Sequence, residues 1–162
     1  MTSRQPAPEP DDATASTLRL LDPAVPAGGT VLELGSRPGS SATLVEAEGV
    51  TVRRTDVTTE ELGGPYDAVL ALRVLQHVDR AQLPVVLGRV AAALRPGGTF
   101  VISLPEGDGE QGEVGDPSVT VLWREPDLCD LLEDVGLDLV RRWATEDSDQ
   151  SPWLTFVTRN GR

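Results

Sequence analysis

One stretch, residues 31–40 (VLELGSRPGS), constrains the fold of this chain more than any other. It opens with an apolar run, interrupted by one glutamate, that predicts a short strand buried on both faces. Gly35 and Gly39 allow a sharp turn and a close approach of the backbone to a ligand, and Ser40 or Ser41 is suited to cap a following helix. Ligands bind where such a strand ends in an open parallel sheet, beside a helix N-terminus. The stretch therefore predicts either a ligand-binding corner or a strand–turn–helix corner that binds nothing.

Alternating apolar patterns continue along the chain and predict an α/β fold. The helix after Asp79 has an apolar stripe at helical spacing, and Asp79 with Gln82 forms a capping box. Pro84 is tolerated only in its first turn. We expect the last strand, which follows a short turn, to run antiparallel to the others. The expected strands cover residues 31–34, 50–55, 66–72, 99–104, 137–144 and 153–158. Two of the expected helices cover residues 40–48 and 126–135. The helix between them is marked by its apolar stripe, which consists of Leu83, Val86, Leu87, Val90 and Leu94.

Two segments have the composition of irregular chain. Residues 1–15 are rich in Pro and acidic residues without periodicity, so we expect a disordered arm preceding one domain over residues 16–162. Residues 105–118 hold four glycines among five acidic residues and predict a mobile loop.

Charge and composition restrict the compartment and the partners. The net charge of −12 argues against nucleic-acid backbones and anionic membranes, which require basic patches. The one cysteine, Cys129, excludes an internal disulfide and fits a reducing cytoplasm. No signal-peptide pattern opens the chain and no apolar run has the length of a membrane span. We therefore expect a cytoplasmic protein that binds neither membrane nor nucleic acid, and we predict no metal site.

Three segments, in the right order, resemble the class I S-adenosylmethionine (SAM)-dependent methyltransferases. Residues 31–40 match the family's glycine motif except at Arg37, where the family usually has glycine. Residues 64–78 (GPYDAVLALRVLQHV) resemble its second signature, and residues 94–98 (LRPGG) its recurrent turn before a strand. The resemblance covers about residues 28–159 and implies a Rossmann-like doubly wound sheet. We count six strands where the family has seven, so one strand–helix unit is missing.

The resemblance also implies a cofactor site for SAM. Glu33 complements the ammonium of the methionine part, and the alternative is a buried carboxylate that pairs with backbone amides. Asp56 corresponds either to the acidic residue after the family's second strand, which holds the ribose hydroxyls, or to the one after its third strand. Since a short right-handed crossover places residues 50–55 beside residues 31–34, we expect the ribose position; otherwise Asp56 caps a turn. The remaining implied cofactor contacts are Gly35, Ser36, Gly39, Val57 and Leu72.

The acceptor side is less constrained by the residues. By resemblance His77, the only histidine, lies near the reaction centre, where a neutral imidazole accepts a proton from the acceptor; alternatively it holds the turn before a helix. Arg73 either meets an anion of the substrate or faces solvent. For Trp123 and Trp153 the core is the safer expectation, and Cys129 has no cationic neighbour in sequence, which indicates a structural role.

The expected function is methyl transfer from SAM to an O, N or C atom of a small-molecule or carrier-bound acceptor. The acidic loop hints at an acceptor that bears an amine. Two alternatives remain open, since fold does not fix function. One is a non-catalytic methyltransferase-like subunit that binds a protein partner or forms a homodimer, and the other is a cyclase-type enzyme that reuses the fold.

Overall fold

The structure is a computed structural model that describes residues 28–35, 51–55, 61–112, 119–146 and 152–161. The expectations for residues 1–15 and for a helix over residues 40–48 lie outside these residues. In chain order the elements are β1 (Thr30–Leu34), β2 (Thr51–Thr55), β3 (Tyr66–Leu72), α3 (Leu83–Ala93), β4 (Leu94–Pro105), β5 (Glu110–Gln111), β6 (Thr120–Val121), α4 (Glu125–Asp134), β7 (Leu137–Glu146) and β8 (Pro152–Asn160).

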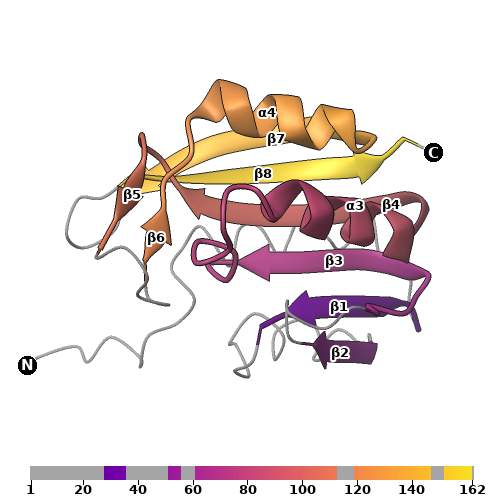
Figure 1. Cartoon of the computed structure of the whole chain (residues 1–162). Coiled ribbons are helices and arrows are strands. Elements are labelled where there is room, and N and C mark those ends of the chain that lie inside the picture. The colour runs from indigo at the N-terminus through magenta and orange to yellow at the C-terminus, as the bar shows by residue number, and fades with distance from the viewer. Residues whose placement is uncertain (1–27, 36–50, 56–60, 113–118, 147–151, 162) are drawn as a thin grey trace, which may run out of the picture.

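Six strands form one sheet in the order β2-β1-β3-β4-β8-β7 (Figure 1). The pairs β1–β2, β1–β3 and β3–β4 are parallel, whereas β8 runs antiparallel to both of its neighbours, β4 and β7. The predicted α/β sheet of six strands with an antiparallel last strand is therefore confirmed. The predicted position of β2 beside β1 is confirmed as well, as the short crossover requires.

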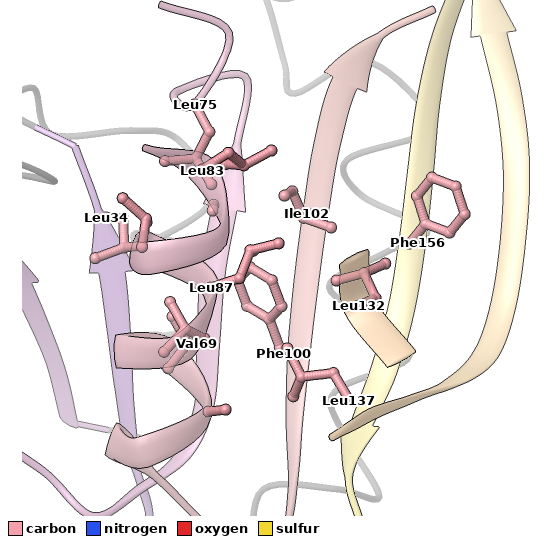
Figure 2. Close-up of a cluster of buried hydrophobic side chains, with 14 of the residues drawn as sticks. Leu34, Val69, Leu75, Leu83, Leu87, Phe100, Ile102, Leu132, Leu137 and Phe156 are labelled. Carbon is pink, nitrogen blue, oxygen red and sulfur yellow. The ribbon is translucent and has the colours of Figure 1, made fainter. Parts of the chain in front are cut away.

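Apolar side chains alternate along the central strands and are buried on both faces of the sheet. Val69 and Ala71 of β3 face α3 and α4, and Ala68 and Leu70 belong to a second cluster on the other face. Figure 2 shows how Leu83 and Leu87 of α3, Leu132 of α4, and Phe100, Ile102 and Phe156 of the strands fill the first cluster. Each large apolar side chain buried in this way stabilises the fold by roughly 1.5–3 kcal/mol.

The helix α3 begins later than its sequence signals suggest. The capping box of Asp79 and Gln82 is wrong: the helix starts at Leu83, and Gln82 is the N-cap residue without a side-chain cap. The backbone carbonyl of Asp79, not its carboxylate, accepts the N–H groups of Gln82 (2.8 Å) and Leu83 (3.1 Å). Pro84 then falls in the first helical turn, where its missing N–H has no helical partner to lose. The predicted apolar stripe is buried throughout, which confirms it.

The amino ends of the parallel strands are closed by polar contacts. Asp67, the acidic residue of the second signature, accepts the backbone N–H of Thr30 (2.8 Å) and forms an ion pair with Arg95 (2.6 Å). The amide of Asn160 in β8 donates to the carbonyls of Ala91, Leu94 and Arg95 where α3 ends. These contacts fix the end of the sheet that lies opposite the candidate site, so Asp67 has a structural role.

The segment after β4 is more ordered than its glycine-rich sequence suggests. The prediction of a mobile loop is wrong for residues 105–112, because β4 continues to Pro105 and β5 pairs with β6. The backbone N–H of Glu106 donates to Pro152 (3.0 Å), and that of Gly107 donates to Trp123 (3.0 Å). Residues 113–118 lie outside the described residues. None of the helices in the described part of the chain has the length and apolar character to cross a membrane.

Candidate functional site at the carboxyl ends of the strands

The candidate site lies at the sheet edge where the parallel strands end (Figure 1, the side of β5 and β6). From β1 the chain moves to β2 on one side, and β3 then pairs on the opposite side of β1. The carboxyl ends of β1 and β3 thus flank a topological switch point, which is where open α/β sheets bind ligands.

Glu33 places a carboxylate inside this edge. It lies in the interior strand β1 between Leu32 and Leu34, and its exposed fraction is only 7%. Its register partners are Leu70 of β3 and Arg54 of β2. A carboxylate is buried only where a hydrogen-bonding or positively charged group compensates it, so this position is suited to a residue that complements a positive charge.

Gly35 makes the turn that follows. Its φ of +143° is unfavourable for other residues, and its N–H donates to the carbonyl of Thr55 at 2.8 Å. A Cβ atom here would lie 3.2 Å from Cγ1 of Val74, so the turn after β1 packs directly against the segment after β3. A buried carboxylate two residues before a glycine at which a side chain is strained and crowded fits the amino-acid end of SAM, which carries an ammonium group.

Leu72 ends β3 at the same edge, and Arg73 follows it. Leu72 is half-buried and pairs in register with Ser103 of β4. The backbone of Arg73 has a φ of +57°, and its N–H donates to the Ser103 hydroxyl at 2.9 Å. Its guanidinium carbon lies 4.4 Å from the ring centroid of Trp153, the second residue of β8. The sequence left the surroundings of Arg73 open, because no local signal connects it to Trp153.

His77 belongs to a segment that is bonded to the β5–β6 hairpin. Its Nδ1 lies 3.0 Å from the carbonyl oxygen of Val119, and the N–H of Val121 donates to the carbonyl of Gln76 at 2.7 Å. Since a carbonyl oxygen only accepts, Nδ1 carries the hydrogen, and Nε2 of the neutral ring is an acceptor. The hydrogen bond joins His77 to the segment before β6, not to the turn before α3, and the side chain is exposed.

Arg80 fastens the same two segments and was missed by the sequence reasoning. Its Nη2 donates to the carbonyls of Leu122 (2.6 Å) and Gly109 (3.2 Å), and its guanidinium lies 4.4 Å from the ring centroid of Trp123. Trp123 and Trp153 are both buried, which confirms the core expectation for these rings. An arginine at the start of a turn carries no sequence signal for contacts with residues so far along the chain.

Further along the same segment, Arg124 links the hairpin to α4. It forms ion pairs with Asp127 (2.9 Å) and Asp108 (3.3 Å). The hydrogen bond from Arg124 to Asp127, and then the charges of Asp127 and Asp108, raise the pKa of the guanidinium above its usual value. These groups are exposed, so the ion pairs orient the segment more than they stabilise it.

Several implied cofactor contacts lie outside the described residues. These are Ser36, Gly39, Asp56 and Val57, together with Arg37; Asp56 directly follows the last residue of β2. Cys129 is half-buried, and Nη1 of Arg142 in β7 lies 3.6 Å from its sulfur, a cationic neighbour that the local sequence does not reveal. Within the described ranges no three His, Cys, Asp or Glu side chains are grouped to hold a metal ion.

Together the fold and the site define an α/β protein with a Rossmann-like sheet and a candidate ligand site at its switch point. A family model described as "Methyltransferase domain" matches residues 9–142. The chain belongs to this family, which confirms the class I SAM-dependent methyltransferase prediction at the level of the family. No curated protein matches the chain.

Solved structures of methyltransferases share the fold at low sequence identity. The 1,6-didemethyltoxoflavin-N1-methyltransferase of Burkholderia thailandensis, crystallised with 1,6-didemethyltoxoflavin and S-adenosylhomocysteine (SAH), is 19% identical, with a TM-score of 0.70, over 94% of this chain and 80% of that one. The magnesium protoporphyrin IX methyltransferase of Synechocystis PCC 6803 with bound SAH is 18% identical, with a TM-score of 0.72, over 91% and 81% of the two chains. The N-methyltransferase NodS of Bradyrhizobium japonicum WM9 is 17% identical, with a TM-score of 0.65, over 93% and 95%.

Proposed function

We propose that this protein transfers the methyl group of SAM to an O, N or C atom of a small-molecule or carrier-bound acceptor. The observation that carries the proposal is the buried Glu33 followed by the side-chain-free turn at Gly35, at the switch point of the sheet. The SAH complexes of the similarly folded methyltransferases support the choice of cofactor.

The cofactor is assigned to the residues that line this edge. Glu33 complements the ammonium of the methionine part, and backbone groups of Gly35, Ser36 and Gly39 receive the rest of that part. Leu72 contributes its backbone from the end of β3. In the same proposal Asp56 accepts the two ribose hydroxyls, each through a charge-assisted hydrogen bond, with Val57 beside it.

Methyl transfer from a sulfonium requires little of the protein beyond positioning the acceptor atom. SAM bound here would supply a methyl group on a sulfonium: an electron pair of the acceptor atom would form the new bond to the methyl carbon as the carbon–sulfur bond breaks, with the neutral thioether SAH as the leaving group. Holding the acceptor atom in line with that bond is the main contribution of the protein.

An O or N acceptor releases a proton, and we assign its removal to His77. The hydrogen bond between Nδ1 and Val119 leaves Nε2 as the acceptor of the neutral ring. The same bond orients the imidazole. His77→Gln would therefore lower turnover of an O or N acceptor while leaving SAH affinity unchanged.

The test is calorimetric titration of the full chain with SAM and SAH. The wild-type protein binds both, and Glu33→Gln weakens binding about 10–100-fold, as expected for the loss of one charged partner. Glu110→Gln, which changes an exposed carboxylate in β5, is the matched control and retains full affinity. Circular dichroism establishes that each variant is folded.

A folded wild-type chain that binds neither SAM nor SAH at millimolar ligand would refute the proposal. Binding that Glu33→Gln leaves unchanged would refute the assignment of the ammonium site. Acceptors are then screened with radiolabelled SAM, starting with small molecules because one similarly folded enzyme was crystallised with such a substrate.

A further inference from the structure

We propose that β7 is a self-association surface, through which two copies of this chain contact each other edge to edge about a two-fold axis. The inference goes beyond the proposed function and does not depend on it. In the sheet, β7 is separated from the strands of the candidate cofactor site, β1 and β3, by both β4 and β8 (Figure 1).

One side of the β7 backbone has no partner among the described strands. β7 has ten residues and stands at the end of the sheet, where it pairs with β8. A long edge strand presents free N–H and C=O groups that can pair with another chain. Most natural edge strands are short or are protected by proline or lysine, and β7 contains neither residue.

Two neighbouring apolar side chains are exposed in the middle of this edge. Leu139 is 41% exposed and Val140 is 55% exposed. In the described part of the chain, the remaining exposed large apolar side chain is that of Val85, which belongs to α3. Apolar residues gathered on an exposed edge strand favour association, because contact removes them from water.

A bulge at Val140 brings two opposite charges to the same face of the sheet. In a regular strand, residues three apart point to opposite faces. Here Asp138 pairs with Arg159 and Arg141 pairs with Val157, and these two residues of β8 are two apart. Since cross-strand partners share a face, Asp138 and Arg141 share one too. Both are exposed, and within the described residues neither forms an ion pair.

A second copy of β7 complements these features in one register. Two strands related by a two-fold axis perpendicular to the sheet run antiparallel, and each face of the sheet continues into the same face of the partner. With the axis between Leu139 and Val140, each of these residues lies beside the other one in the second copy. The same register places Asp138 opposite Arg141 twice. Both bulges lie at the axis, so the irregular edge of one strand meets an identical edge.

Charge also favours this edge as the place where two copies meet. With a net charge of −12, two chains repel each other over much of their surface. β7 itself is neutral, because Arg141 and Arg142 balance Asp138 and Glu146. Contact through β7 therefore forms two ion pairs without placing like charges directly opposite each other.

Sedimentation velocity of the full chain over a range of concentrations tests the proposal. We expect the wild-type chain to pass from monomer to dimer as its concentration rises. Arg141→Asp sets two carboxylates opposite each other at both pairs, and Asp138→Arg sets two arginines opposite each other. Each substitution is expected to weaken dimerisation at least about tenfold. Combining the two exchanges the charges and is expected to restore dimerisation.

Matched variants separate this edge from a general effect of charge or polarity. Glu110→Arg makes a comparable change of charge on the exposed strand β5 and is expected not to weaken dimerisation. Val140→Lys places two ammonium groups near the axis and weakens it, whereas Val85→Lys on α3 leaves it unchanged. Circular dichroism spectra and SAH affinity are expected to stay constant in all variants, since none of these residues belongs to the candidate cofactor site.

A chain that stays monomeric at every concentration overturns the inference and leaves the edge to a partner of another kind. A dimer that Arg141→Asp and Val140→Lys do not weaken overturns it as well, because the contact then lies elsewhere. Weakening by the single charge reversals without restoration by their combination refutes the proposed register. Loss of SAH binding in the wild-type chain refutes the proposed function alone.

Discussion

At the scale of single residues, two glycines in different environments predict opposite effects of the same substitution. Gly35→Ala places a methyl group 3.2 Å from Val74 on a backbone with φ of +143°. We expect a loss of about 1–3 kcal/mol in the free energy of unfolding and weaker SAH binding. Gly88→Ala in α3 meets nothing within 4 Å, so we expect a gain of about 0.5–1 kcal/mol. Urea denaturation measures both, and equal effects of the two substitutions would contradict the argument.

Two substitutions of Asp67 separate the contribution of its ion pair with Arg95 from that of its hydrogen bond with Thr30. Asp67→Asn retains an acceptor for the N–H of Thr30 but removes the charge that faces Arg95. Because the Arg95 side chain is 44% exposed, the lost ion pair is expected to cost less than about 1 kcal/mol. Asp67→Ala also leaves the Thr30 N–H without its side-chain acceptor, which adds about 1–3 kcal/mol. Chemical denaturation of both variants gives the difference, and identical losses would show that the hydrogen bond contributes nothing.

The same residues show what sequence reasoning can reach. Resemblance to the family's motifs, which are local in sequence, implied Glu33, Gly35 and Leu72 as cofactor contacts; the structure places all three where β1 and β3 end, and their roles stay predictions. The contacts of Arg73, Arg80 and Cys129 were not predicted, because each partner comes from a distant strand or helix. The predicted helix start at Asp79 was wrong because the backbone carbonyl of Asp79 already accepts the N–H groups of Gln82 and Leu83, which a capping carboxylate would otherwise accept.

At the scale of elements, Arg80 joins the segment after β3 to the β5–β6 hairpin. Arg80→Ala removes two hydrogen bonds and a stacked cation. We expect amide hydrogen exchange to accelerate at Val121 and Leu122, while Val101 in the centre of the sheet keeps its protection. Exchange measured by NMR or mass spectrometry tests this, and the prediction fails if all three amides accelerate together.

The order of the elements was largely predictable, and their ends were not. Five of the six long strands and both described helices follow alternating or helical apolar patterns, and the sixth, β2, follows from its place before Asp56. The pairing between β5 and β6 has no counterpart in the sequence pattern. Strands of two residues are defined by backbone hydrogen bonds and are too short to show an alternation of apolar and polar residues. For that reason the glycine-rich composition of residues 105–112 indicated a mobile loop where the structure has a paired one.

At the scale of the whole molecule, the net charge of −12 predicts a response to salt. Like charges repel in the compact state, and added salt screens them. We expect the urea midpoint at pH 7 to rise as sodium chloride increases from low to physiological concentration. The same series with the Arg95→Gln variant controls for the ion pair with Asp67. A midpoint that falls with salt would show that favourable ion pairs outweigh the repulsion.

The place of β8 in the sheet has a consequence for biosynthesis. Residues 152–160 pair with β4 on one side and β7 on the other, and Phe156 and Asn160 complete the core and the end of α3. A ribosome delivers these residues after every other strand of the sheet. Until they emerge, β4 has an unpaired edge and the apolar face beneath α4 is incomplete, which is the condition that favours aggregation and chaperone capture. The nascent chain therefore completes its native sheet in a late step, when β8 inserts between β4 and β7.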